Sequence, residues 1–432
     1  TGTFTATAGV GYFLNTTGGT ITVNLPVGAA GSSVALADYA ATWQTNNVTV
    51  AANGTEKIGG VDADVTLSTE GQSVTFVYID GTQGWVNVLD STSNVRGTTY
   101  ITATVSGSCN TLSTSGDYKI AEFKGPGTFC VSAGAGGLAV VDYMVVAGGG
   151  GGGGSSDGSI YGGAGGGAGG WRGSAGTTTG CYTAGPLAAG VATLPVSVQG
   201  YPITVGGGAP TTPATTPSQP NSRIGSNGSN SIFSTITSAG GGVGGSRHTN
   251  TGAPPSITIS KGANGGSGGG SSEGESYAYL GGTGNIPVQS PAQGFNGGNA
   301  APADCGPNQG VTGGGGATEL GQRGPGTAGG DPGGAGGAGI TSCISASPVA
   351  YAGGGGSGGI ANGGNGGAGG TGNPAGVGGA NSCGGGVAGG NAAVNTAGGG
   401  GGASGRTHTA CGGGAGGSGG SGIVYIRYKF QN

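Results

Sequence analysis

The sequence predicts an all-β protein in two parts. Small β modules come first, and a glycine-rich lattice of polyglycine-II helices with loops and essentially no α-helix follows. Glycine accounts for 117 of the 432 residues. Only 21 of these glycines lie before residue 147, and the other 96 follow. Apolar and polar residues alternate in the first part, which is the period of a half-buried strand.

The N-terminal residues predict a small sandwich or barrel. Short alternating segments are separated by Gly, Asn, Asp and Ser, at the spacing typical of such folds. In the first of them Ile21, Val23 and Leu25 share one face. The segments are residues 20–25, 48–50, 65–67, 73–79 and 85–89. We assign residues 1–93 to one compact all-β module.

A second β segment is expected over residues 94–146. Two apolar-rich runs, 117–123 and 128–131, are separated by the sequence KGPG. Pro-Gly between such runs indicates a hairpin or tight turn. The segment ends with the apolar run 140–146, directly before the first long glycine run.

The glycine runs have a period of three. Gly-Gly-X repeats occupy residues 333–339, 363–372 and 413–422. Three residues per turn is the period of a polyproline-II-type helix, which has no internal hydrogen bonds. Packed side by side, such helices can pair their N–H and C=O groups with one another. Close packing needs positions without a Cβ, hence two glycines in three. Residues 147–432 are therefore expected to form a polyglycine-II domain, with disorder as the alternative.

The strand expected at residues 423–430 closes this domain. Val424, Ile426, Tyr428 and Phe430 lie on one face of it. Such an apolar face should pack against β structure, and the run 140–146 is the natural partner. Collagen is not expected, because it requires a strict Gly-X-Y repeat rich in Pro.

Two resemblances add to these patterns. Residues 11–16 (GYFLNT), 21–26 (ITVNLP) and 78–85 (YIDGTQGW) resemble small β-modules repeated in tail fibres of phages that infect aquatic bacteria. The run 140–147 before seven glycines, together with 419–428 (GGSGIVYIRY), resembles the framing strands of the glycine-rich domain of phage tail-fibre proteins and some bacterial surface proteins.

The resemblance implies a non-enzymatic tail-fibre or fibre-tip protein of a virion that contacts a host bacterial surface. The implied partners are other copies of the chain, in a homo-oligomer expected to be a trimer, other tail proteins, and a host glycan or outer-membrane protein. The alternatives are a purely structural capsid or appendage fibre and a bacterial extracellular adhesin or filament subunit. An ice-binding protein is a further alternative, but the β modules and long loops disfavour it.

Composition argues against several other classes. Twelve basic and sixteen acidic residues leave a net charge of −4, so no basic stripe for nucleic acid is expected. No apolar run has the length of a membrane span. The chain contains no Gly-Lys pair for a phosphate loop, and no zinc-type spacing accompanies His248 or His408. We expect no enzyme activity, no cofactor and no metal.

Seven cysteines are present, without a C-x-x-C motif. Cys109 and Cys130 both lie in the second β segment, and we expect a disulfide between them. The odd total leaves at least one further thiol unpaired or available to another chain.

Recognition should reside in the segments that interrupt the glycine runs, because a backbone-bonded lattice offers few side chains. Aromatic, charged and small polar residues together suit a receptor surface. The candidates are Trp171, Tyr182, Arg247, His248, Glu273, Tyr277, Tyr279 and Tyr351.

Overall fold

The computed structural model describes residues 2–91, 100–134, 139–155, 162–176, 185–214, 225–246, 259–272, 280–300, 310–324, 332–359, 375–380, 386–405 and 412–431. They fall into two compact units, Thr1–Thr98 and Thr99–Asn432. Helical backbone in these ranges is confined to the 3-10 turn Pro186–Ala188 and residues 259–260. No helix in the described ranges has the length and apolar character needed to cross a membrane. The expected all-β class is confirmed.

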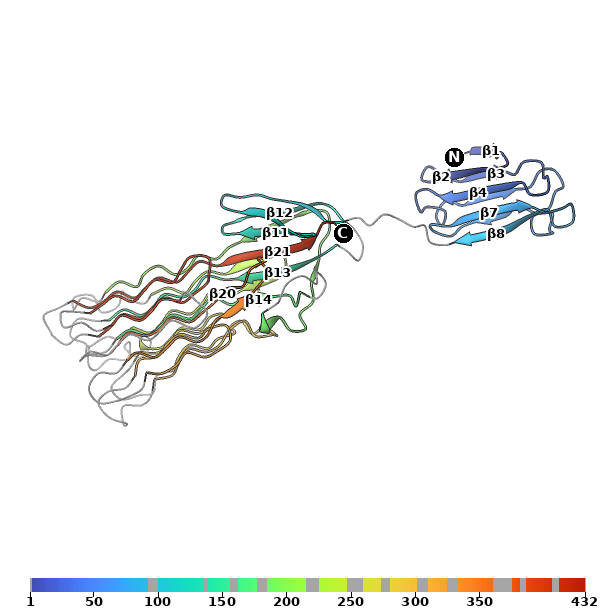
Figure 1. The fold of residues 1–432 in the computed structure, drawn as a ribbon. Coiled ribbons are helices and arrows are strands. Elements are labelled where there is room, and N and C mark those ends of the chain that lie inside the picture. The colour runs from blue at the N-terminus through green and yellow to red at the C-terminus, as the bar shows by residue number, and fades with distance from the viewer. Residues whose placement is uncertain are drawn as a thin grey trace. The chain divides into compact units, whose positions relative to one another are not determined.

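The first unit consists of two four-stranded sheets that share one core (Figure 1). One sheet has the order β1-β3-β5-β6, and the other the order β2-β4-β7-β8. The strands are β1 (Gly2–Thr5), β2 (Val10–Leu14), β3 (Ile21–Asn24), β4 (Ser33–Asp38), β5 (Val48–Ala51), β6 (Val65–Leu67), β7 (Ser73–Tyr78) and β8 (Trp85–Ser91). Every second residue of β4 is buried, and Trp43 and Trp85 are fully buried between the sheets. The alternation seen in the sequence therefore marks the inner faces of a sandwich.

The second unit begins with two larger sheets. Their orders are β10-β11-β21-β13-β14, with β15 also paired to β13, and β18-β17-β16-β12-β9. The strands are β9 (Thr102–Val105), β10 (Thr111–Ser115), β11 (Tyr118–Phe123), β12 (Gly127–Ala133), β13 (Val140–Val146), β14 (Trp171–Gly173), β15 (Leu194–Pro195), β16 (Gly200–Thr204), β17 (Ser231–Phe233), β18 (Ile236–Ser238) and β21 (Ile423–Lys429). A separate pair comprises β19 (Ile340–Ser342) and β20 (Val349–Tyr351).

Two expectations change here. Of the two alternatives expected at KGPG, the structure has the turn and not the hairpin, because β11 and β12 belong to different sheets and the turn leads from one to the other. Nor do residues 94–146 form a segment of their own. Strands β9 to β13 pair with β16, β14, β15 and β21, which come from the glycine-rich part, so the second unit runs from Thr99 to the end.

The closing strand β21 lies where the sequence places it. It pairs antiparallel with β13, from Asp142 opposite Arg427 to Val146 opposite Ile423. Its Val424, Ile426 and Tyr428 join a core between the two large sheets. The opposite face of β21 is buried as well, because Ile423 and Tyr425 pack under β14, β19 and β20.

The glycine runs form extended tracts that are bonded to one another and run away from the sheets (Figure 1). The N–H groups of residues 148–153 donate to three tracts in rotation, and every third residue returns to the same tract. The acceptors, in chain order, are the carbonyls of Ser229, Gly420, Gly167, Ser226, Gly417 and Ala164. A rotation of three per turn with no bond inside the tract is the geometry of polyglycine II.

The tract of residues 162–170 lies at the centre of this lattice. Its N–H groups donate to the tracts 397–403, 239–245 and 312–315. Its carbonyls accept from the tracts 147–153, 267–270 and 355–358. Three neighbours through donors and three through acceptors give hexagonal packing, so the expected polyglycine-II lattice is confirmed for the described tracts.

Glycine is required because the tracts touch backbone to backbone. A Cβ built on Gly165 would lie 1.9 Å from the carbonyl oxygen of Gly355. One built on Gly166 would lie 2.3 Å from that of Gly150. Side chains fit only where a gap falls, as at the fully buried Ala164 and Ala168.

Candidate functional site

The tracts share a common far end, which we call the tip. Tract direction defines it, since residues 147, 171, 397 and 422 adjoin the sheets and the other end of each of those tracts points away from them. Described residues stop and resume at the tip, at 155 and 162, 246 and 259, 272 and 280, and 405 and 412, among others. The tip is thus the end of the lattice at which the described tracts stop and resume.

Buried serines hold the tracts together at the tip. In each case a hydroxyl accepts a backbone N–H from a neighbouring tract. The N–H to Oγ pairs are Gly154–Ser246 (3.0 Å), Gly414–Ser155 (2.8 Å), Ala300–Ser271 (2.8 Å), Gly334–Ser357 (2.7 Å) and Val387–Ser404 (2.8 Å). None of these serines is among the residues expected from the sequence. Their signal is a Ser that follows a glycine or alanine at the end of a run, as in Gly154-Ser155 and Ala403-Ser404.

Most of the expected receptor residues lie outside the described residues. Arg247 and His248 fall between Ser246 and residue 259 in the sequence, and Glu273, Tyr277 and Tyr279 fall between Ser272 and residue 280. The described residues on both sides of these two segments belong to the tip. Tyr182 is also outside the described residues, between residues 176 and 185 on the sheet side.

Trp171 and Tyr351 are not surface residues, which corrects their assignment as receptor contacts. Both are 2% exposed. Trp171 opens β14 opposite Val146 and packs in a core with Met144. Tyr351 ends β20, and its ring meets that of Tyr425 edge-on at 6.4 Å. These two side chains therefore fill the core between the sheets and the lattice.

The expected Cys109–Cys130 disulfide is also wrong. Both thiols are free and exposed. Cys130 lies in β12 opposite Thr104, whereas Cys109 lies in the turn after β9, five residues further along.

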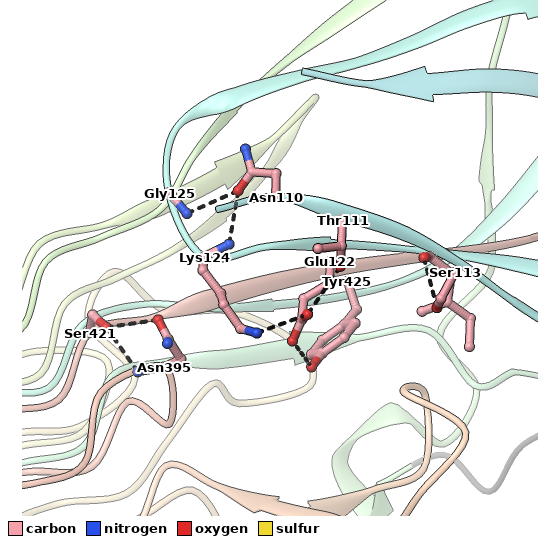
Figure 2. Close-up of polar contacts among 10 residues, drawn as sticks. Asn110, Thr111, Ser113, Glu122, Lys124, Gly125, Asn395, Ser421 and Tyr425 are labelled. Atoms are coloured by element: carbon pink, nitrogen blue, oxygen red, sulfur yellow. Dashed lines mark hydrogen bonds and ion pairs between the residues drawn. The ribbon is translucent and has the colours of Figure 1, made fainter. Parts of the chain in front are cut away.

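A polar cluster with a shifted carboxyl group surrounds Glu122 on β11 (Figure 2). Tyr425 donates its phenol hydrogen to Glu122 Oε1 at 2.6 Å. Lys124 Nζ lies 3.0 Å from Glu122 Oε2, and Thr111 Oγ1 donates to the same oxygen at 3.3 Å. Figure 2 also shows Asn110 accepting the N–H groups of Lys124 and Gly125, which shapes the turn beside the cluster.

The ionisation of this cluster is fixed. Burial acts to raise the pKa of Glu122, but hydrogen bonds from Tyr425 and Lys124 outweigh it and hold the pKa below the usual carboxyl value. Burial, Tyr351 and Glu122 raise the pKa of Tyr425. The pKa values of the Glu122 carboxyl group and the Tyr425 phenol are therefore shifted in opposite directions. Near neutral pH the carboxyl group stays ionised and the phenol stays protonated. The cluster ties β11 to β21 as a fixed acceptor and donor.

Within the described ranges, no group of three or more His, Cys, Asp and Glu side chains could hold a metal ion.

Comparison with known proteins gives one family. No curated protein matches the chain significantly. A family of glycine-rich domains does match, over residues 124–429, a range that begins in the turn after β11 and ends with β21. The match spans more than half of the chain, and it covers the lattice with the two strands that frame it. The chain therefore belongs to the glycine-rich domain family.

Proposed function

We propose that this chain is a structural protein of a phage tail fibre, located in the virion at the fibre tip, and that it attaches the particle to the host bacterial surface. The observation that carries the proposal is the common tip, where the described tracts of one lattice end and are followed in the sequence by segments of unlike composition. The resemblance of the framing strands to those of phage tail-fibre proteins supports the viral assignment.

The lattice and the segments at its tip would have different roles because their chemistry differs. Carbonyls and amides saturate one another inside the lattice, so the lattice has little left with which to tell ligands apart. Discrimination then falls to segments such as 247–258 and 273–279, whose Arg, His, Glu and Tyr suit a host glycan or an outer-membrane protein. The first unit would serve attachment to other tail proteins, and self-association, as a trimer, would present several tips at once.

The test is adsorption of particles that carry Arg247→Ala, Tyr277→Ala and Tyr279→Ala together. Removal of anchoring side chains at a binding hot spot typically costs about 2 kcal/mol or more, so adsorption should fall at least tenfold. The matched control is Tyr39→Ala, which removes a 67% exposed tyrosine from the first unit. Tip variants that attach as well as the parent would overturn the adhesin proposal and favour a purely structural fibre.

A further inference from the structure

The lateral surface of the lattice has its own chemistry. A tract inside the lattice needs a carbonyl in each of the three directions that its N–H groups face. A tract at the surface lacks a neighbour on one side, so some of its N–H groups should remain for water or for another chain. The same problem arises at the edge strand of a sheet, which recruits further strands unless it is blocked.

Asparagine side chains supply the missing carbonyls. In the tract 239–245, Gly241 and Gly244 donate to backbone carbonyls of one neighbour, and Gly242 and Gly245 to those of another. The third direction is different. Gly240 donates to Oδ1 of Asn230, and Val243 donates to Oδ1 of Asn227, both at 2.9 Å.

The arrangement recurs on the tract 280–284. Gly282 donates to the backbone carbonyl of Gly269. Gly281, Thr283 and Gly284 donate instead to asparagine side chains, each at 2.8 Å. These N–H to Oδ1 pairs are Gly281–Asn299, Gly284–Asn296 and Thr283–Asn264. A sixth pair, Ser418–Asn391 at 2.9 Å, lies on the tract that leads to β21.

Spacing and exposure set these asparagines apart from incidental contacts. Asn227 and Asn230 are three residues apart, as are Asn296 and Asn299, so each pair follows the period of the helix it serves. All six side chains are exposed to solvent while their carbonyls point at a backbone donor. A carboxamide carbonyl has the same acceptor chemistry as a peptide carbonyl, which makes Asn a direct substitute for a missing tract.

We infer that these six asparagines close the lateral surface of the described lattice, each supplying a carbonyl in a direction where no described tract does so, and that they prevent a second copy of this chain from adding its own tracts there. The competing occupant is a second copy because its glycine tracts carry carbonyls at the same three-residue pitch. This inference concerns the sides of the lattice and does not depend on what the tip binds.

The experiment compares the full chain with Asn227→Ala/Asn230→Ala and with Asn227→Asp/Asn230→Asp. Aspartate keeps an oxygen acceptor at each position, so it is the conservative control. Hydrogen exchange is followed by mass spectrometry on peptides that span residues 239–245, and assembly size by mass photometry over a concentration series. Circular dichroism, together with exchange in peptides from β13 and β21, verifies that each variant is folded.

In the Asn227→Ala/Asn230→Ala variant, the amide hydrogens of Gly240 and Val243 should exchange at least tenfold faster than in the parent. This variant should also form larger assemblies than the parent as its concentration rises. The aspartate pair should match the parent in both measurements. Unchanged exchange in the folded alanine pair would overturn the acceptor role. Faster exchange without larger assemblies would overturn closure against a second copy.

Discussion

Three consecutive glycines, residues 206–208, allow the lattice geometry to be tested one position at a time. They follow β16 and lie on one tract. A Cβ built on Gly208 would lie 2.1 Å from the carbonyl oxygen of Gly419, and one built on Gly206 would lie 2.0 Å from that of Ser229. A Cβ added to Gly207, between them, would have no atom within 4 Å, and this position does not require a positive φ.

The size of the effect follows from these distances. Ordinary van der Waals contact of a Cβ begins at 3.4 Å, so in Gly208→Ala the backbone at residue 208 must move away from Gly419 by about 1.3 Å. The bond from the Gly419 N–H to the Ala209 carbonyl, now 2.9 Å, would then be lost. Gly419 is half-buried, so leaving its N–H without a partner costs about 1 kcal/mol, the low end of the range for a buried donor, and overpacking adds about 1–3 kcal/mol. We expect a loss of about 3 kcal/mol in the free energy of unfolding.

Gly207→Ala is the matched control. It adds the same methyl group one residue away and has room for it. Because alanine restricts the unfolded chain more than glycine does, stability should be unchanged or higher by about 0.4–1 kcal/mol. Gly206→Ala should behave like Gly208→Ala.

The assay is pulse proteolysis of the full chain in a urea series, which distinguishes the two units by fragment size. Midpoints for the second unit should follow the order Gly207→Ala, parent, Gly208→Ala, from highest to lowest. If all three alanine variants lose the same stability, or if Gly207→Ala is the worst, the backbone-contact explanation for the glycine repeat is refuted.

Three further predictions concern the sheets. The pKa of Glu122 is lowered in the folded state, so its bonds stabilise the protein at every pH above the ordinary carboxyl pKa of about 4.3. This stabilisation is lost as the pH falls through the lowered pKa. Glu122→Gln should remove this part of the acid dependence, which urea midpoints measured from pH 7 to pH 3 would show. Trp171→Ala should lower the stability of the second unit by about 3–5 kcal/mol, whereas an equally stable variant would show that the side chain is not in the core. Cys109 and Cys130 should both react with a maleimide in the native, unreduced protein, and peptide mapping that finds either one protected would contradict the free thiols.

The features that repeat or alternate can be predicted from the sequence. The period of three, the need for glycine and the apolar alternation of β7 and β21 can be predicted because each depends on local geometry alone. The pairing of β21 with the run 140–146 was predicted from one apolar face.

The sequence does not predict which tract lies beside which. A polyglycine tract has no side chain to distinguish its neighbours, so the order of tracts within the lattice cannot be predicted from the glycine runs. The distinguishing residues are the exceptions in the pattern, the tip serines and the lateral asparagines, and each contacts a residue of another tract. The burial of Trp171 and Tyr351 was missed for the same reason, since the segments that cover them come from elsewhere in the chain.

The position of β21 also has a kinetic consequence. This strand is central in its sheet, between β11 and β13, and its Tyr425 bonds to Glu122 across 303 residues. During synthesis β11 and β13 are therefore made long before the strand that joins them, and each has an open edge for that whole time. Closure of so long a loop is slow, and exposed edges are prone to aggregate. The second unit should thus complete its folding only after β21 has left the ribosome. Until then, the open edges of β11 and β13 make it most prone to aggregate.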